Sequence, residues 1–161
     1  MSKSQNQESP KKQETLFNCS NYKFGIVVSE WHSDITSKME EKAKNILKLS
    51  NCQSKNIHII KVPGSFELPL AAKILSKKKN LQGIICLGCI IKGETSHFSF
   101  ISSSISDAIM KLNLELNIPV IFGVLTVDNI KQAEERINKG SEAAKSLIKM
   151  TELKSKLKTW I

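Results

Sequence analysis

The 161-residue sequence lacks any long apolar run, and this absence excludes a membrane-spanning protein. No stretch approaches the roughly 18 apolar residues that cross a bilayer. The N-terminal residues are rich in Ser, Gln, Lys and Glu and contain no signal-peptide core. We therefore expect a cytoplasmic protein with no membrane partner. Its organisation is predicted as a flexible polar tail over 1–16 and a single domain over 17–161.

Cysteine is scarce, with four residues at positions 19, 52, 86 and 89. They show no framework of the kind that small secreted domains use, so a reducing cytosol fits best. Cys86 and Cys89 match a C-x-x-C pattern, but they lie inside the apolar run 83–91, where thiols usually act as small core residues. No second ligand pair stands at zinc spacing, so no metal is expected, and a redox or zinc role for this pair is the alternative.

Arginine is almost absent, since Arg136 is the only one among 24 basic residues. Its planar fork suits a phosphate or carboxylate, whereas lysine serves well on a surface. Arg136 is therefore either an anion-binding residue or part of a helical surface ion pair with Glu134, Glu135 or a neighbour. The net charge of +9 comes from scattered lysines without interleaved aromatics. We expect no nucleic-acid partner, although charge alone keeps nucleic-acid binding as a hypothesis.

Apolar residues follow two periodicities along the chain. Strands are predicted over 24–29, 57–62, 83–91 and 120–125. Helices are predicted over 34–48, 66–75 and 97–117, then one capped by Asn129 with Gln132 and one capped by Ser141, after an interruption at 138–140. The fully apolar run 83–91 is typical of a central parallel strand. This alternation predicts an α/β fold, a three-layer α-β-α sandwich with a four-stranded, mainly parallel, flavodoxin-like doubly wound sheet.

Ligands of such folds bind beyond the carboxyl ends of the strands. The loops there span 30–33, 63–67, 92–97 and 126–128, and none contains a dinucleotide fingerprint or a Walker loop, so no cofactor is expected. The helix start at 93–96, preceded by Lys92, either receives a phosphate or is an ordinary helix start capped by Thr95 or Ser96.

Three side-chain groups at this rim have both a functional and a structural explanation. His97 can move protons near neutral pH, or it is simply exposed. Trp31 can stack on a planar ring, or it packs where it stands. Residues 64–67 either contribute to a site or form only a tight turn and helix cap. Each signal is weak when it is taken alone.

Three ordered segments together resemble the lumazine synthases: VPGSFELPLAAK at 62–73, LGCIIKGETSHF at 87–98 and PVIFGVLT at 119–126. The similarity covers residues 22–152. It implies a cofactor-free transferase of riboflavin biosynthesis, which condenses 5-amino-6-ribitylaminouracil with 3,4-dihydroxy-2-butanone 4-phosphate to give 6,7-dimethyl-8-ribityllumazine, phosphate and water. It also implies a homopentamer or a sixty-subunit icosahedral shell with sites at subunit interfaces, and riboflavin synthase as a further partner.

The resemblance assigns roles to individual residues. His97 would be the catalytic proton-transfer residue, and Glu142 would orient and charge-stabilise it. The pyrimidine and ribityl groups would be bound by Trp31, Ser65, Phe66, Glu67, Ile90, Ile91 and Phe122. The phosphate would be bound by Lys92, Gly93, Glu94, Thr95, Arg136 and Lys139. Arg136 and Phe122 would reach the site from the adjacent subunit.

The chain departs from the family's pattern at two places. His32 stands where the family usually has asparagine, and the segment after Arg136 is shorter than the usual glycine-rich loop. These departures motivate the alternative hypothesis, a non-catalytic shell or scaffold protein on the same fold.

Overall fold

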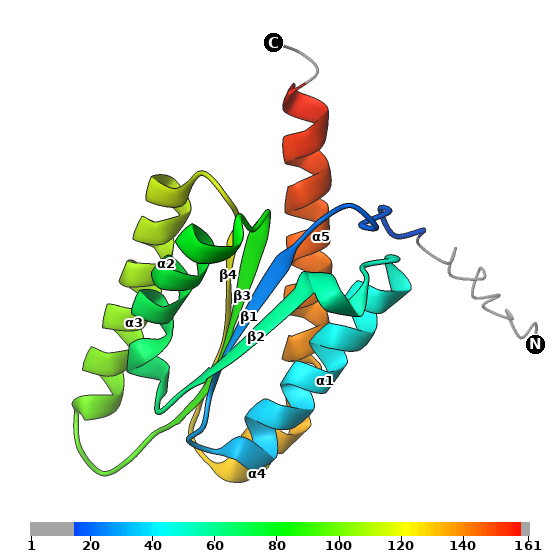
Figure 1. The fold of residues 1–161 in the computed structure, drawn as a ribbon. Coiled ribbons are helices and arrows are strands. Elements are labelled where there is room, and N and C mark those ends of the chain that lie inside the picture. Colours follow the sequence, from blue (N-terminus) through cyan, green and yellow to red (C-terminus); the bar gives the residue numbers. More distant parts are fainter. Residues whose placement is uncertain (1–14, 159–161) are drawn as a thin grey trace, which may run out of the picture.

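A computed structural model of the chain describes residues 15–158. The predicted tail therefore lies outside the described residues up to position 14. Within 15–158 the chain alternates strands and helices (Figure 1). These elements are β1 (Phe24–Ser29), α1 (Ser33–Leu49), β2 (Ile57–Val62), α2 (Leu68–Lys79), β3 (Gly83–Ile91), α3 (His97–Leu116), β4 (Val120–Val127), α4 (Ile130–Glu135) and α5 (Lys139–Lys158), with short 3-10 turns η1 (Ser54–Asn56) and η2 (Ser65–Glu67).

The four strands form one parallel sheet in the order β2-β1-β3-β4. The register pairs Phe24 of β1 with Ile57 of β2 and with Gly83 of β3, and Ile84 of β3 with Val120 of β4. All carboxyl ends thus meet at one edge. Because β3 lies inside the sheet with helices on both faces, its sequence is apolar at nearly every position. The predicted three-layer α/β fold is confirmed.

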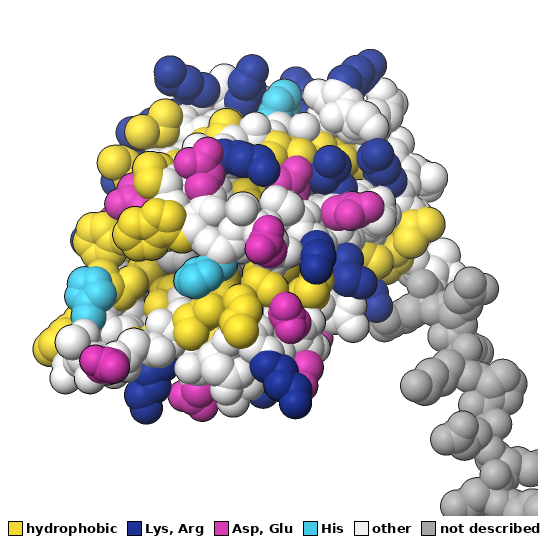
Figure 2. Space-filling view, turned by 90° about the horizontal axis from the view of Figure 1, so that it is seen from below, with side chains coloured by type: hydrophobic (Ala, Val, Ile, Leu, Met, Phe, Trp, Pro, Cys, Tyr) yellow, Lys and Arg dark blue, Asp and Glu magenta, His cyan; other side chains and the backbone are white. Residues whose placement is uncertain are grey.

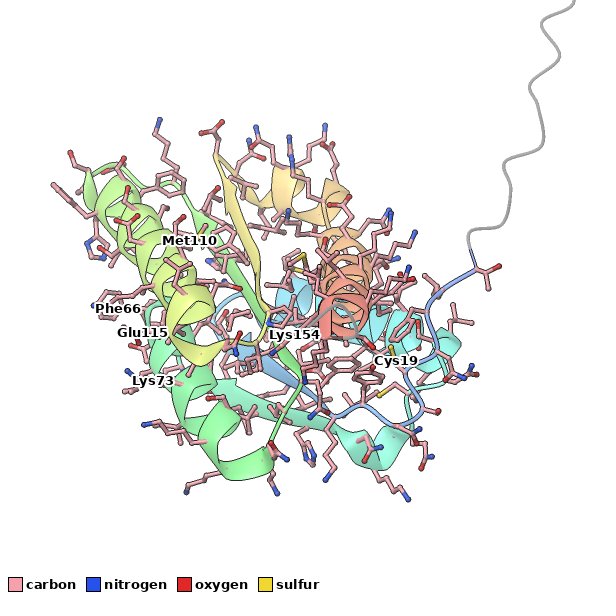
Figure 3. All side chains as sticks on the ribbon, turned by 90° about the horizontal axis from the view of Figure 1, so that it is seen from above. Cys19, Phe66, Lys73, Met110, Glu115 and Lys154 are labelled. Carbon is pink, nitrogen blue, oxygen red and sulfur yellow. The ribbon has the colours of Figure 1, made fainter. Side chains whose placement is uncertain are left out.

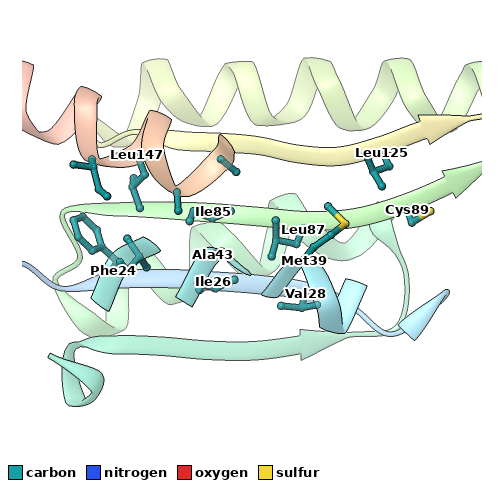
Figure 4. Packing of buried hydrophobic residues seen from close by; sticks show 14 of the residues in the cluster. Phe24, Ile26, Val28, Met39, Ala43, Ile85, Leu87, Cys89, Leu125 and Leu147 are labelled. Atoms are coloured by element: carbon teal, nitrogen blue, oxygen red, sulfur yellow. The ribbon is translucent and has the colours of Figure 1, made fainter. Parts of the chain in front are cut away.

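Two helical layers cover the sheet, α1 with α5 on one face and α2 with α3 on the other (Figure 1). Alternating β3 side chains serve the two cores. Ile85 and Leu87 join the α1/α5 core, where Leu147 of α5 is fully buried (Figure 4). Ile84 and Cys86 join the α2/α3 core. Each layer therefore has its own hydrophobic cluster, and the sheet separates them.

The two helices of the α1/α5 layer approach each other closely at Gly140. The predicted interruption between two helices is confirmed, but it falls at residues 136–138 instead of 138–140, and Ser141 lies inside the second helix instead of capping it. Helix α5 begins at Lys139 and contains Gly140, which is buried. A Cβ at Gly140 would overlap the carbonyl oxygen of Met39 and come within 2.8 Å of its Cα. The glycine is therefore explained by contact between two helix backbones, not by a break in the helix.

In the other layer, the side chain of Asn113 joins α3 to β4. Its amide nitrogen donates to the carbonyls of Ile109 (3.0 Å) and Val120 (2.7 Å), and its oxygen accepts from the Val120 N–H (2.8 Å). These bonds pair the N–H and carbonyl of Val120, the first residue of β4, which is an edge strand of the sheet. Nothing in the apolar periodicity pointed to this polar residue.

Most predicted boundaries lie close to the observed ones. Strand β4 continues two residues past Leu125, because Ile90 and Ile91 still pair with Thr126 and Val127. Helices α2 and α3 end before left-handed residues, Asn80 (φ 49°) and Asn117 (φ 53°), as asparagine allows. The predicted helix from 66 begins instead as the turn η2, and α2 starts at Leu68.

The predicted Asn129 cap of α4 is confirmed, since its side chain accepts from the Gln132 N–H at 3.0 Å. In a capping box the Gln132 side chain would accept from the N–H of Asn129 in return, but here it accepts from the residue before it. Gln132 Oε1 accepts from the N–H of Asp128 at 2.9 Å, in place of the capping residue's own N–H. The end of β4 is thereby tied to the first turn of α4.

All four cysteines are free and buried, which confirms the predicted core position of Cys86 and Cys89. Burial raises the pKa of Cys86 to about 12 and that of Cys89 to about 11, so both thiols are protonated at neutral pH. The two side chains belong to cores on opposite faces of the sheet. They therefore cannot act together as a redox pair or a chelate.

Within residues 15–158, no group of three or more His, Cys, Asp or Glu side chains is placed to hold a metal ion. None of the helices described there has the length and apolarity that crossing a membrane requires.

Candidate active site

The carboxyl ends of β1, β2 and β3 open into a cavity of about 360 Å³. Figure 2 looks onto this end of the molecule and shows hydrophobic side chains gathered near histidines. The lining comes from the loop after β1, the turn η2, the end of β3 and the start of α3. These residues are Trp31, His32, Ser65, Phe66, Glu67, Cys89, Ile90, Ile91, Gly93, Thr95, His97, Phe98 and Ile101. One chain therefore brings together most of the predicted pyrimidine-site residues, His97 and part of the predicted phosphate site.

Trp31 forms one wall of this cavity and is 70% exposed. Its loop is held against β2, because the N–H groups of Glu30 and Trp31 donate to the carbonyls of Val62 (2.8 Å) and Pro63 (3.1 Å). The indole lies over Gly64, where a Cβ would come within 3.2 Å of the ring. Such exposure does not fit the alternative that Trp31 simply packs where it stands. An open aromatic face at a cavity wall is suited to stacking on a planar ring.

The turn η2 contributes Ser65, Phe66 and Glu67 to the lining of the cavity. Ser65 is buried beneath β3, so close that a Cβ at Gly88 would overlap its hydroxyl. Glu67 is exposed, and its carboxylate accepts from the N–H of Gly64 at 2.8 Å. The structural explanation of this segment as a capped turn is therefore correct for Glu67. The same bond fixes the carboxylate at the cavity, where it can accept hydroxyl hydrogen bonds.

The start of α3 forms a further part of the cavity lining. The Thr95 hydroxyl accepts from the His97 N–H at 3.4 Å, whereas Ser96 makes no side-chain capping bond. No acidic residue lies in the first turn, and the space beside Gly93 is open. A helix N-terminus of this kind attracts an anion through its N–H groups and its dipole. Lys92 and Glu94 lie in the same loop but do not line the cavity.

A second hollow of about 540 Å³ runs along β4, the end of α4 and the start of α5. It contains the predicted residues Phe122, Arg136, Lys139 and Glu142, and it shares no lining residue with the first cavity. A single chain therefore does not bring Arg136 or Phe122 to His97. Glu142 likewise lies with Arg136 and not with His97.

Arg136 ends helix α4, where its Nη1 donates to the carbonyl of Gln132 at 3.1 Å. Over residues 15–158 it forms no ion pair with Glu134 or Glu135, so the surface-pair explanation is wrong there. The exposed guanidinium shares its hollow with Lys139, which gives this hollow two cations suited to a phosphate.

Sequence reasoning did not assign some cavity residues. Phe98 and Ile101 extend the apolar wall, and the i, i+4 relation of Ile101 to His97 was the available signal. His32 was noted only as a departure from the family's pattern. It also lines the cavity, with a left-handed backbone (φ 57°, ψ 45°) that no sequence pattern predicted.

Comparison with known proteins gives one consistent result. The family model described as 6,7-dimethyl-8-ribityllumazine synthase matches residues 21–155. A protein of that name from Cytophaga hutchinsonii is 48% identical over 138 residues, which cover 83% of this chain and 87% of that protein. One from Parabacteroides distasonis is 46% identical over 131 residues, covering 78% and 82%. Because both the model and these relatives cover most of the chain, the chain belongs to the 6,7-dimethyl-8-ribityllumazine synthase family.

Proposed function

We propose that the chain condenses 5-amino-6-ribitylaminouracil with 3,4-dihydroxy-2-butanone 4-phosphate to give 6,7-dimethyl-8-ribityllumazine, phosphate and water. Family membership supports this reaction. The observation that carries it is the cavity itself, which joins an open indole face, an imidazole and a helix N-terminus. These are the groups needed for a planar ring, proton transfers and a phosphate.

In this proposal, the pyrimidine stacks on Trp31 between the apolar side chains of Phe66, Ile90 and Ile91. The ribityl chain meets the Ser65 hydroxyl and the Glu67 carboxylate. The phosphate of the ketone lies at the start of α3, near Gly93 and Thr95. Bringing two substrates together in this order supplies much of the acceleration, because a bound pair reacts without the entropy loss of an encounter.

His97 then moves the protons. The substrate amine attacks the ketone carbonyl and water leaves as an imine forms. Removal of the proton on C3 of the ketone then expels phosphate from C4 and leaves an enol, which tautomerises to a new carbonyl at C3. The second amine attacks this carbonyl and closes the ring with loss of the second water. An imidazole at the cavity mouth can accept and return protons at each stage near neutral pH. The protein needs no covalent nucleophile and no cofactor in this scheme.

We further propose that a neighbouring copy completes each site with Phe122, Arg136, Lys139 and Glu142. Two observations support this arrangement. The hollow that holds these residues is separate from the His97 cavity of the same chain. The α2/α3 layer also leaves large apolar side chains uncovered, including Leu70 (65% exposed), Met110 (62%) and Leu114 (81%). Figure 3 shows Phe66 and Met110 on this side of the molecule. Apolar surface of this kind is typical of an interface.

The proposed assembly is a homopentamer, with a sixty-subunit shell as its larger form, and riboflavin synthase is a proposed partner because it consumes the product. A cytoplasmic location is supported by the four unpaired thiols. Light scattering of the purified chain distinguishes the pentamer from the shell, and a monomer at all concentrations would contradict both.

The activity test uses the purified chain with both substrates and follows the appearance of the lumazine by its absorbance and fluorescence. We expect product well above the uncatalysed condensation. An assembled protein that forms no product above that background would favour the scaffold hypothesis. Omitting each substrate in turn provides the control.

A mixing experiment tests the shared site. The variants His97→Ala and Arg136→Ala are each expected to be weakly active alone, but co-expression places an intact His97 beside an intact Arg136 at some interfaces. Random mixing in a cyclic assembly predicts recovery of about a quarter of wild-type activity. If both residues served the same site from one chain, co-expression would restore nothing.

A further inference from the structure

We propose that the chain holds a further oxyanion site at the edge of the sheet opposite the His97 cavity, where the ammonium groups of Lys154 and Lys158 and the hydroxyls of Tyr22 and Ser155 bind a phosphate group. This site goes beyond the proposed function, which uses only the other edge of the sheet. It starts from a hollow of about 250 Å³ whose lining includes these residues.

The hollow lies at the amino ends of the strands. Its other lining residues are Asn80, Leu81, Gln82, Ile118 and Thr151. Tyr22 comes shortly before β1, Gln82 directly before β3, and Ile118 shortly before β4. Because β3 has nine residues, about 30 Å separate this edge from the edge that carries the His97 cavity. Figure 3 looks onto the amino ends and shows Lys154 between α5 and the end of α3.

Lys154 reaches the hollow from α5 and is held at the end of α3. Its ammonium group donates to the carbonyl of Asn117, the left-handed residue that ends α3. Cations commonly bind the last carbonyls of a helix, so this bond gives Lys154 a structural explanation. The bond uses only one of the three N–H donors of an ammonium group. The other two donors are therefore available to a ligand at a fixed place.

The charged side chains of the hollow are of one sign. Lys158 lies four residues after Lys154 on α5, so the two ammonium groups repel each other. Burial lowers the pKa of Lys154, and the charge of Lys158 lowers it further. The lining contains no Asp or Glu, and neither lysine forms an ion pair with a carboxylate of residues 15–158. An anion between the two lysines would be attracted by both and would offset their repulsion.

Two hydroxyl groups add to these donors. The ring of Tyr22 is fixed by its neighbours, since it stacks on Phe24 with 6.2 Å between centroids and meets Phe17 edge-on at 5.6 Å. In the part of the chain that the structure describes, neither the Tyr22 hydroxyl nor the Ser155 hydroxyl bonds to another group. Both hydroxyls can therefore donate to a ligand beside the lysines.

The donors and the volume of the hollow point to a small phosphate. Two ammonium groups and two hydroxyls can serve several oxygens around one centre, as a tetrahedral phosphate presents them, whereas a carboxylate has only two oxygens. A hollow of about 250 Å³ is smaller than the usual site of a drug-sized ligand. It therefore suits inorganic phosphate or the phosphate group of a small ester.

The test follows the broadening of ³¹P resonances as protein is added to inorganic phosphate or, separately, to glycerol 3-phosphate. Arg136→Ala is the background, because it weakens phosphate binding at the proposed active site. In this background Lys158→Gln should weaken binding about tenfold, since a hydrogen bond to a charged group is lost. Lys38→Gln removes the same charge from an exposed position outside the hollow and should stay within about twofold. Tighter binding of the ester would identify an ester as the ligand, and equal or tighter binding of the ion would identify free phosphate.

Lys154→Gln should weaken binding to a similar extent. It also removes the bond to Asn117, so its melting temperature is compared with that of Lys158→Gln, which lacks this complication. In the wild-type background, Lys158→Gln should form lumazine at the wild-type rate, because the hollow is remote from His97.

Two results would overturn the inference. One is equal phosphate binding by Lys158→Gln and Lys38→Gln, which would show a general attraction to the basic surface. The other is displacement of phosphate by an equal concentration of acetate, which would show that the hollow does not select a phosphate. If the wild-type chain forms no lumazine while Lys158→Gln still weakens phosphate binding, only the proposed function fails.

Discussion

The two helical layers that cover the sheet differ in how they are held and in what they expose. Helices α1 and α5 meet backbone to backbone at Gly140 and Met39, and the core beneath them is closed. Helices α2 and α3 are joined to each other by an ion pair, Lys73 to Glu115 (3.3 Å), and α3 is tied to β4 through Asn113. Two helix backbones thus touch in the α1/α5 layer, whereas the α2/α3 layer joins its helices through polar side chains and also lines the His97 cavity.

The α2/α3 layer carries the His97 cavity together with uncovered apolar surface, although α1 and α5 also expose large apolar residues such as Leu49 (71%) and Leu157 (50%). His97, Phe98 and Ile101 line the cavity from one end of α3, while Leu114 is 81% exposed near the other end. In the α1/α5 layer, Leu147 and Met39 are fully buried. If this comparison is right, substitutions at the cavity end of the α2/α3 layer should lower activity, whereas substitutions in the closed α1/α5 core should lower stability.

The largest effect is expected in the α2/α3 layer, for His97→Ala. Loss of the proton-transfer group should lower kcat by about 10²- to 10⁴-fold. The midpoint of urea unfolding should not move, because the side chain is exposed. His58→Ala is the matched control, since His58 lies on β2 and lines neither the His97 cavity nor the Arg136 hollow. Equal loss of activity in both variants would contradict the assignment.

The second effect is expected in the α1/α5 layer, for Gly140→Ala. Alanine favours a helix by about 1 kcal/mol over glycine. Here the added Cβ must force apart two helix backbones, and the cost of this overpacking should exceed the gain in helix propensity. The free energy of unfolding should therefore fall by about 3 kcal/mol. Urea unfolding measures it. Gly93→Ala provides the control for stability alone, because a Cβ there meets no atom within 4 Å. An unchanged Gly140→Ala variant would show that the helices can separate freely.

A third, smaller effect is expected for Asn113→Ala. This change leaves the N–H and carbonyl of Val120 without the side-chain partners they have now, and an unsatisfied buried group costs about 1–3 kcal/mol. Thermal unfolding should show the loss, with Asn45→Ala on the exposed surface of α1 as the control. A loss no larger than that of the control would show that water replaces the Asn113 amide.

The smallest effect is expected for Lys73→Ala, which removes the ion pair between α2 and α3. Both partners are about half exposed, at 44% and 40%. Water and salt screen such a pair, so the free energy of unfolding should fall by less than about 0.5 kcal/mol, and this difference from wild type should shrink as salt is added. A larger loss would mean that the α2/α3 layer depends on this contact more than the comparison allows.

The fold could be predicted from the sequence because each strand and helix carries its own apolar pattern, and that pattern matches the face that the element buries in the fold. Every predicted strand and helix is present, and the apolar run 83–91 is the central strand β3. The errors concern contacts between distant segments. A glycine near the start of a helix is easily taken for part of a break, and only the contact of Gly140 with the backbone of Met39 explains it. The residues around Asn113 likewise give no local sign that its side chain bonds to Val120 of β4.

The candidate site was predicted from loops at strand ends together with the family resemblance. That reasoning correctly expected Trp31, Ser65, Glu67 and His97 to converge on one cavity. It could not foresee that His32 also lines the wall, because a left-handed residue changes the side to which a side chain points. Only the resemblance assigned Arg136 to the adjacent subunit. The loops at the strand ends gave no sign of it, because the position of Arg136 depends on β4 at the edge of the sheet and on which chain lies beside it.

The buried cysteines give each layer a chemical reporter of its own. Cys86 belongs to the α2/α3 core, whereas Cys19 and Cys52 belong to the α1/α5 core. Because an alkylating reagent needs the thiolate, and burial keeps these thiols protonated and covered, each cysteine becomes reactive only when its own core opens. Alkylation followed by mass spectrometry could therefore measure the opening rates of the α1/α5 core and the α2/α3 core separately, in the protein without any introduced label site.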